Sequence, residues 1–393
     1  MSANIRSEDP KTLMVFMDGT WQTSDQEVPT NIEKLHKQIK RKHLGRNQLT
    51  KHIDGVGSGG WADKIFGGAF GSGLTERIVS AYIFLADNYS PGDRIVLCGY
   101  SRGSFSARSL AGMINKVGLV SWKKCAARSG QDEDVLRRSK KGRKKIARRA
   151  FLLYKDDKET SEVLRDRGVD VPDSFSPSHP YARALRKEYS FTDSEGNVSS
   201  QIDMLCCFET VGMLGIPEFA LGKLASRHNE KYDFHDTELG KIIGNAYHAV
   251  AIDERRASFP LTPMVASTDH NTTNLQQWWF TGAHGIGGGA NTDKDGNDLR
   301  TGLADIAGHW MAERLLAGGV GLKEGWAKTF DRDPLAQPNN VFFHNLKMGP
   351  DTPRKINKTA RVHQSVFVRQ SEVKSYKPTN LQDAIAAQAL SDA

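Results

Sequence analysis

Cysteine is scarce in this chain of 393 residues, which carries only Cys98, Cys125, Cys206 and Cys207. Four cysteines at irregular spacing cannot form the disulfide framework of a small secreted domain. The paired C-x-x-C spacing of a zinc site is also missing. We therefore expect reduced, buried thiols, and we expect neither a metal ion nor an organic cofactor.

Long apolar segments are also missing. No stretch approaches the ~18 to 20 apolar residues that cross a bilayer, and the first residues lack the cleavage pattern of a signal peptide. Hydrophobic residues make up 38% of the chain and charged residues 25%, which is enough apolar material for a folded core. These features indicate a globular protein made in the cytoplasm. If it is exported, it leaves by a route that uses no signal peptide.

The net charge of +8 is concentrated in one segment. Residues 122–200 contain 19 Lys or Arg and 13 Asp or Glu, and nine basic residues lie between Arg137 and Arg149. Such a run can be a solvated helix face, or it can attract anionic lipid head groups or nucleic-acid phosphates. Because few aromatic residues stand among the basic ones, binding to nucleic acid is the least favoured of the three.

Continuous apolar runs alternate with segments of helical spacing. The runs Leu13–Met17, Ile95–Cys98 and Ile202–Phe208 are typical of strands buried on both faces, as in a parallel sheet. Further strands are expected at Tyr247–Ile252 and Gln277–Thr281, with edge strands at 339–345 and 361–369. The pattern predicts an α/β fold with a mostly parallel sheet and helices on both of its faces.

The order of these segments suggests four parts. Residues 12–121 form the first part of the core, and residues 122–200 form a basic helical insertion or cap. Residues 201–320 form the second part of the core, and residues 321–393 form a loop-rich C-terminal extension.

The most informative segment is Gly99-Tyr100-Ser101-Arg102-Gly103, which stands between an apolar strand and a helix. This G-x-S-x-G pattern is the nucleophile elbow of α/β hydrolases, in which the serine occupies a strained, tight turn and needs glycines on both sides. The hydroxyl group of Ser101 then projects at a helix N-terminus, where the backbone N–H of Arg102 can donate to an oxyanion. We predict that Ser101 is a nucleophile.

A serine nucleophile needs a histidine as base and an acid that orients it. In α/β hydrolases the acid follows the serine in the chain, and the histidine follows the acid. Asp253 follows one predicted strand and His284 follows the next, so these two residues are the expected acid and base. Glu209, at the end of an earlier strand, is the alternative acid, and His363 is the alternative base. Histidines 36, 43 and 52 are interpreted as surface or loop residues.

The first predicted strand ends at Asp18-Gly19-Thr20. The backbone N–H of Gly19 or Thr20 is a candidate second donor to the oxyanion. An aspartate at this position also occurs in phosphotransfer folds, but the sequence offers no second carboxylate motif. The glycine-rich stretch 55–73 lacks the G-x-x-x-x-G-K-[ST] phosphate loop and is interpreted as a flexible rim of the site.

Six motifs, in this order along the chain, resemble those of a known protein family. They are MVFMDGTW (14–21), DGVGSG (54–59), GYSRGSFSAR (99–108), FETVGMLG (208–215), HAVAIDERRASFPL (248–261) and WWFTGAHGIGGG (278–289). Over roughly residues 12–320 the chain resembles the α/β-hydrolase family of formerly unknown function that includes the type VI secretion phospholipase effectors. The family commonly has aspartate where this chain has Glu209. It also commonly has His-Ser-Asp-Val-Gly-Gly-Gly where this chain has His284-Gly285-Ile286-Gly287-Gly288-Gly289.

The resemblance implies a serine esterase fold and, in the characterised branch, phospholipase A activity against bacterial membranes with an accompanying immunity protein. We therefore expect a serine carboxylic-ester hydrolase, of phospholipase A type, that acts on a lipid or ester substrate through a Ser-His-Asp triad and an acyl-enzyme. An anionic membrane surface and an immunity or accessory protein are the expected partners. The alternative is a catalytically inactive, hydrolase-like protein that uses the basic insertion to bind a membrane, nucleic acid or a protein.

Overall fold

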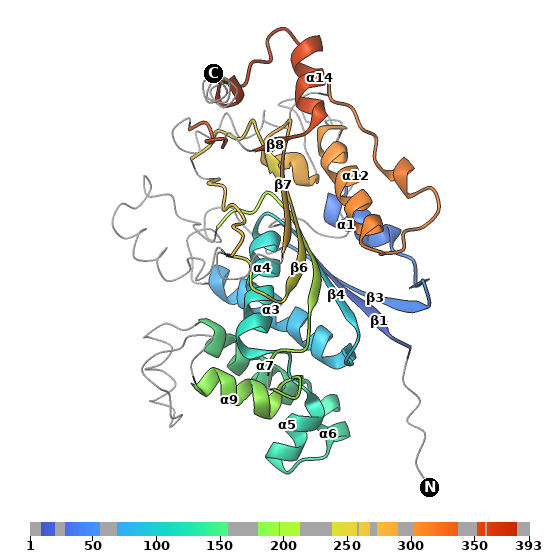
Figure 1. Ribbon diagram of the computed structural model, residues 1–393, viewed down its shortest axis with the longest axis vertical. Helices are drawn as coiled ribbons and strands as arrows, with labels where there is room; N and C mark the ends of the chain where they lie inside the picture. Colours follow the sequence, from blue (N-terminus) through green and yellow to red (C-terminus); the bar gives the residue numbers. More distant parts are fainter. Residues whose placement is uncertain are drawn as a thin grey trace, which may run out of the picture.

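The computed structural model describes residues 9–19, 28–55, 69–155, 180–195, 197–212, 238–257, 259–267, 273–289, 302–336, 352–357 and 360–382. Within these ranges the chain forms one eight-stranded sheet, drawn in Figure 1. In spatial order its strands are β2 (Lys42–His43), β3 (Arg46–Ile53), β1 (Lys11–Met17), β4 (Arg94–Tyr100), β5 (Ile202–Phe208), β6 (Ile243–Ala251), β7 (Asn274–Phe280) and β8 (Arg361–Val362).

All neighbouring strands run parallel except β2, which forms an antiparallel pair with β3. The central strands are apolar on both faces because helices cover both sides of the sheet, as the alternation of apolar runs and helical segments predicts. The helices are α1 (Asn31–Gln38), α3 (Ala69–Asn88), α4 (Arg102–Val117), α5 (Trp122–Ser129), α6 (Glu133–Arg138), α7 (Lys140–Lys155), α9 (Pro180–Tyr189), α12 (Gly302–Ala317) and α14 (Gln364–Glu372), with short 3-10 turns η1 (His284–Gly287) and η2 (Trp326–Thr329). The predicted α/β-hydrolase fold is confirmed.

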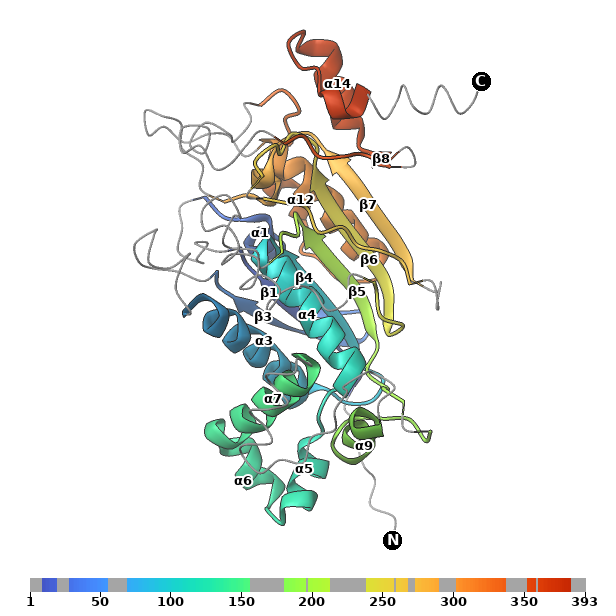
Figure 2. The same ribbon diagram turned by 90° about the vertical axis from the view of Figure 1, so that its left-hand side faces the viewer.

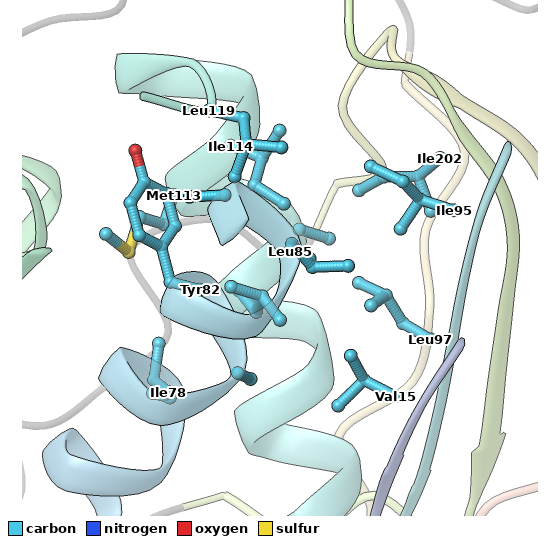
Figure 3. Packing of buried hydrophobic residues seen from close by; sticks show 14 of the residues in the cluster. Val15, Ile78, Tyr82, Leu85, Ile95, Leu97, Met113, Ile114, Leu119 and Ile202 are labelled. Carbon is cyan, nitrogen blue, oxygen red and sulfur yellow. The ribbon is translucent and has the colours of Figure 1, made fainter. Parts of the chain in front are cut away.

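In the described residues, two large apolar cores, one on each face of the sheet, hold the layers together, and a smaller third cluster packs α14 against β6 and β7. On one face, α3 and α4 pack on the sheet, and Figure 3 shows the side chains that meet there, among them Tyr82 of α3, Ile114 of α4 and Leu97 of β4. On the other face, α1 and α12 pack on the opposite side chains of the same strands, including Phe16 and Val96. Because successive residues of a strand point to opposite faces, one strand such as β4 contributes to both cores.

The basic segment of the sequence forms α5, α6, α7 and α9. Helix α4 begins at the carboxyl end of β4 and runs back along the sheet, so the helices that follow it gather at the amino ends of the strands (Figures 1 and 2). In the described residues these helices lie beside α3 and α4 and do not cover the carboxyl edge. Of the two predicted alternatives, a helical insertion or a cap, these residues have the position of an insertion beside α3 and α4.

Several basic side chains of α7 are paired with acids of α3. Lys144 Nζ lies 2.6 Å from Glu76 Oε2, Arg148 also binds Glu76, and Arg143 binds Asp87. These pairs account for part of the positive charge as contacts between two helices.

Two expectations for the C-terminal extension have different outcomes. The segment 361–369 is a two-residue strand followed by α14, because His363 caps the helix by accepting a hydrogen bond from Ser365 N. The predicted edge strand there is thus wrong beyond Val362. The segment 339–345 lies outside the described residues, as does most of the glycine-rich stretch, whose last residues open α3. No helix in the described ranges is both long and apolar enough to cross a membrane.

Candidate active site

Polar side chains gather where the parallel strands end. Ser101 follows β4, Glu209 follows β5, Asp253 comes two residues after β6, and His284 comes four residues after β7. The carboxyl ends of parallel strands meet at one edge of the sheet, which is the edge where α/β folds place their ligands. The sheet thus brings together residues that lie far apart in the sequence.

The turn that carries Ser101 has the strain of a nucleophile elbow. Ser101 has φ 56° and ψ −120°, which L-residues rarely adopt. A Cβ atom on Gly99 would lie 2.5 Å from the carbonyl oxygen of Gly103, and one on Gly103 would lie 2.1 Å from the carbonyl oxygen of Met17. Both glycines are therefore required by the close approach of backbone to backbone, as the G-x-S-x-G pattern predicts.

Ser101, His284 and Glu209 form a hydrogen-bonded chain. His284 Nε2 lies 2.8 Å from Ser101 Oγ, and His284 Nδ1 lies 3.1 Å from Glu209 Oε2. With Nδ1 protonated, the imidazole donates to the carboxylate and its Nε2 accepts the hydroxyl proton of the serine. This is the arrangement of a serine hydrolase triad with glutamate as the acid.

His284 is held in place through its backbone and its ring. Its backbone N–H donates to Glu254 Oε2 at 3.1 Å, and its carbonyl accepts from the hydroxyl group of Tyr100 at 3.1 Å. The ring of Phe259 packs against the imidazole with 4.7 Å between ring centres. Burial lowers the pKa of His284, and the hydrogen bond that its Nδ1–H donates to Glu209 opposes this effect without cancelling it. The histidine is thus neutral, and able to act as a base, at neutral pH.

Glu209 is completely buried and has φ 48°. Its Oε1 accepts from the backbone N–H of Ala251 at 2.6 Å, and Arg354 binds both of its oxygens, at 2.7 and 2.9 Å. Burial alone would raise the pKa of this carboxyl, but the Arg354 guanidinium and His284 hold it well below its usual range. Glu209 is therefore a carboxylate that faces the base. Nothing in the sequence around Arg354 indicated this contact.

Asp253, the predicted acid, does not contact His284. Its Oδ2 accepts from the backbone N–H of Gly282 at 2.7 Å, and the hydroxyl group of Tyr376 lies 3.0 Å from both carboxylate oxygens. Burial raises the pKa of Asp253 to about 6. The prediction that Asp253 orients the histidine is wrong, and the alternative acid Glu209 takes this place. Asp253 instead anchors the segment that follows α14.

His363, the alternative base, lies away from Ser101. It caps α14 and stacks on Phe280, with 4.7 Å between ring centres, and burial lowers its pKa to about 4. His52, interpreted from the sequence as a surface or loop residue, instead lies in β3, and its Nε2 is 3.1 Å from the buried carboxylate of Asp18. Burial works against protonation of His52, but the bond to Asp18 prevails and raises its pKa.

The candidate oxyanion donors lie next to the serine. Arg102 is the first residue of α4, so its backbone N–H stands at the positive end of a helix dipole beside Ser101. A Cβ atom on Gly19 would lie 3.5 Å from that of Ser101, so the loop after β1 also reaches the nucleophile. The N–H of Gly19 points to Asp18 Oδ1 at 3.2 Å. Thr20 lies outside the described residues.

A cavity of about 1090 Å³ adjoins these residues. Phe259 and Arg354 line it, and both contact the hydrogen-bonded chain of Ser101, His284 and Glu209. Much of its wall is apolar and comes from the loop after β6 and from β7, namely Leu261, Pro263, Met264, Val265, Leu275 and Trp279. In the described ranges, no group of three His, Cys, Asp or Glu residues is arranged to hold a metal ion.

Comparison with known proteins identifies the family of this chain. A family model described as the catalytic domain of Tle1-like phospholipase effectors of the type VI secretion system matches residues 11–314. A protein of Saccharomyces cerevisiae, described as uncharacterized, is 27% identical over 275 residues, which are 66% of this chain and 34% of the yeast protein.

Two solved structures are similar in part. One is an uncharacterized protein from Pseudomonas aeruginosa, with 15% identity, a TM-score of 0.43 and coverage of 82% of this chain and 49% of the other. The second is a Tle1 effector bound to the VgrG spike of the type 6 secretion system, with 17% identity, a TM-score of 0.35 and coverage of 72% and 51%. The chain thus spans about a third of the yeast relative and about half of each solved chain.

Proposed function

Because the chain belongs to the family of Tle1-like phospholipase effector catalytic domains of type VI secretion, we propose that it is a serine hydrolase that cleaves an acyl ester of a phospholipid. The observation that carries the proposal is the hydrogen-bonded chain from Ser101 Oγ through His284 to Glu209. The strained backbone of Ser101 supports it, because such strain is typical of functional sites.

The mechanism follows from the order of the hydrogen bonds. His284 Nε2 takes the proton of Ser101 as Oγ attacks the ester carbonyl, and Glu209 stabilises the imidazolium that forms. Backbone N–H groups beside the serine, with that of Arg102 the best placed, hold the negative oxygen of the tetrahedral intermediate. His284 then protonates the leaving alcohol and leaves an acyl-enzyme. Water, deprotonated by His284, attacks the acyl-enzyme, releases the fatty acid and restores the serine.

Two features near the triad favour a phospholipid over a small neutral ester. The apolar cavity lined by Leu261, Met264 and Trp279 offers space for an acyl chain. Arg102 follows the serine directly, and burial, and then repulsion from Arg77, lowers the pKa of Arg102 to about 10. A phosphate group would relieve this repulsion, because arginine pairs well with phosphate oxygens.

The remaining expectations are part of the same proposal. Because the family model describes effectors of the type VI secretion system, a component of that system is the partner proposed for delivery of this chain. An immunity or accessory protein and an anionic membrane surface are the other partners proposed. Synthesis in the cytoplasm followed by export without a signal peptide is the corresponding route.

The experiment uses the full chain and its Ser101→Ala variant. A fluorophosphonate probe should label the wild-type protein and not the variant, and mass spectrometry of vesicle lipids should show free fatty acid and lysophospholipid with the wild type alone. The variant should melt at the wild-type temperature, and its turnover should fall by about 10⁴-fold or more. A folded wild-type protein that neither reacts with the probe nor releases fatty acid would instead be a non-catalytic interaction protein with the hydrolase fold.

A further inference from the structure

The guanidinium group of Arg354 lies directly against the carboxylate of Glu209. Its side chain is 8% exposed, and besides the two bonds to Glu209 it donates to the carbonyl oxygens of Ala251, at 3.0 Å, and Phe259, at 3.1 Å. The first carbonyl belongs to the residue whose N–H also binds Glu209, and the second belongs to the residue whose ring packs on His284. One side chain thus connects the acid with the two backbone segments that enclose the base.

The hydrogen bonds to the Glu209 carboxylate fix its orientation. Each oxygen of Glu209 is shared between Arg354 and one other donor, which is Ala251 N for Oε1 and His284 Nδ1 for Oε2. A two-bond arginine pair fixes the plane of a carboxylate as well as its position. With Arg354 in place, Oε2 points to the imidazole.

The charge of Arg354 matters for the same reason. Glu209 is fully buried, and a buried carboxylate without a cation tends to bind a proton. A protonated Glu209 could not stabilise the imidazolium of His284. Other charged or titratable groups face this pair, namely Glu254 and Arg256 after β6, His248 of β6 and Tyr100 of β4, but within the described residues only Arg354 forms an ion pair of opposite charge with Glu209 besides His284 itself.

Arg354 comes from the C-terminal extension. It lies 40 residues beyond the end of the family match at residue 314, in the segment 352–357. The N–H of Thr352 donates to the carbonyl of Arg255 at 2.6 Å, and farther along Tyr376 binds Asp253. The extension is thus attached to the loop after β6 on both sides of Arg354.

We propose that Arg354 is a positioning residue of the triad, which turns the Glu209 carboxylate toward His284 and keeps it negatively charged. This inference rests on the proposed serine hydrolase function. It makes the C-terminal extension a required part of the catalytic site, although the family match ends before it.

The test compares Arg354→Gln, Arg354→Lys and the control Lys374→Gln in the full chain. Lys374 is an exposed cation of the same extension, so its loss changes the net charge equally. On a soluble ester, Arg354→Gln should lower kcat by on the order of 10²-fold and leave KM within about 3-fold, since complete failure of the acid costs about 10⁴-fold. Arg354→Lys, which keeps the charge and loses one of the two bonds, should lose about 10-fold, and the control should be unchanged.

The pH profile separates positioning from general loss of structure. Removing a positive charge beside the Glu209–His284 pair makes the pair easier to protonate, so the acid limb of kcat/KM should move to higher pH in Arg354→Gln and stay near its wild-type place in Arg354→Lys and the control. If the glutamine variant folds with wild-type kcat and an unmoved acid limb, the proposal is wrong. If that variant does not fold, wild-type kcat in Arg354→Lys overturns it.

A readout that needs no turnover keeps this inference separate from the proposed function. The proton between His284 Nδ1 and Glu209 should give a low-field proton NMR resonance, identified by its absence in His284→Ala. It should shift or disappear in Arg354→Gln and persist in Lys374→Gln. An inactive wild-type protein with this pattern would contradict the proposed function alone, and an unchanged resonance in Arg354→Gln would contradict the role of Arg354.

Discussion

Two acidic residues at neighbouring strand ends have opposite environments. Glu209 is bound by a histidine and an arginine, whereas Asp253 is bound by a backbone N–H and a tyrosine hydroxyl. The first environment favours the carboxylate and lowers the pKa, and the second is governed by burial, which raises it. The same chemical group is therefore suited to catalysis at one position and to structural attachment at the other.

A pair of isosteric substitutions tests this difference. Glu209→Gln should lower kcat/KM by about 10³- to 10⁴-fold, because the amide can hold the imidazole in the wrong tautomer. Asp253→Asn should keep activity within about 10-fold, since Asp253 does not contact His284. Steady-state kinetics of both variants measure the loss of activity, and their melting temperatures show whether they are folded. A larger loss of activity in a folded Asp253→Asn variant would return the role of the acid to Asp253.

At the scale of elements, the sequence predicted the segments that depend on local signals. The tight turn at Ser101 is predictable because glycines flank it at positions 99 and 103, and His284 is predictable as a neighbour of Ser101 because it follows a parallel strand. The acid was assigned wrongly because Glu209 and Asp253 both follow strands in the required chain order. The choice between them depends on the backbone at Glu209, whose positive φ turns its side chain toward the imidazole, and on a cation 145 residues away. No local pattern carries that information.

Within the described residues, the basic side chains of helix α7 fall into two groups, one exposed and unpaired with α3 and one paired with an acid of α3. Lys141, Lys145 and Arg149 recur at every fourth position and are exposed, whereas Lys144 and Arg148 are paired with Glu76 of α3. The helix lies toward the amino ends of the strands, so a membrane bound to it would not face the elbow directly (Figure 2). Binding through α7 and hydrolysis at Ser101 should therefore be separable.

Reversing the three exposed charges to glutamate should weaken binding to anionic vesicles by more than about 10-fold at low salt, since each basic residue near such a surface contributes roughly 1 kcal/mol. Turnover of a soluble ester should stay within about 2-fold. The matched control reverses Lys328, Lys374 and Lys377, which are exposed elsewhere. Vesicle sedimentation measures the binding. Equal binding by both triple variants and the wild type would mean that this face of α7 is only solvated.

At the scale of the whole molecule, one buried and two half-buried histidines connect stability with pH. Burial is the largest cause that lowers the pKa of His36 and His363 to about 4 and that of His248 to about 3. At pH 5 these three are mostly neutral when folded and take up protons on unfolding. Asp253, with its pKa raised to about 6, is protonated when folded and releases its proton on unfolding. Summed over these four groups, the uptake on unfolding at pH 5 is about two protons, so their contribution to stability should fall as the pH drops below about 6.5.

Calorimetry should therefore show a melting temperature several degrees lower at pH 5 than at pH 7. His248→Asn should narrow this difference, although it lowers the melting temperature at pH 7 by removing the bonds to Gln277 and Thr210. A melting temperature that rises toward pH 5 would mean that these histidines are protonated in the folded protein.

The spacing of the catalytic contacts along the chain has a consequence for synthesis. Ser101 and His284 are 183 residues apart, Glu209 and His284 are 75 apart, and Glu209 and Arg354 are 145 apart. Contacts of such separation form late, because distant segments must first be brought together. On the ribosome Ser101 emerges roughly 250 residues before Arg354, and domains fold as the chain emerges. A nascent chain can thus build most of its sheet before Arg354 reaches Glu209, and under the proposed mechanism full activity requires that the C-terminal extension has docked.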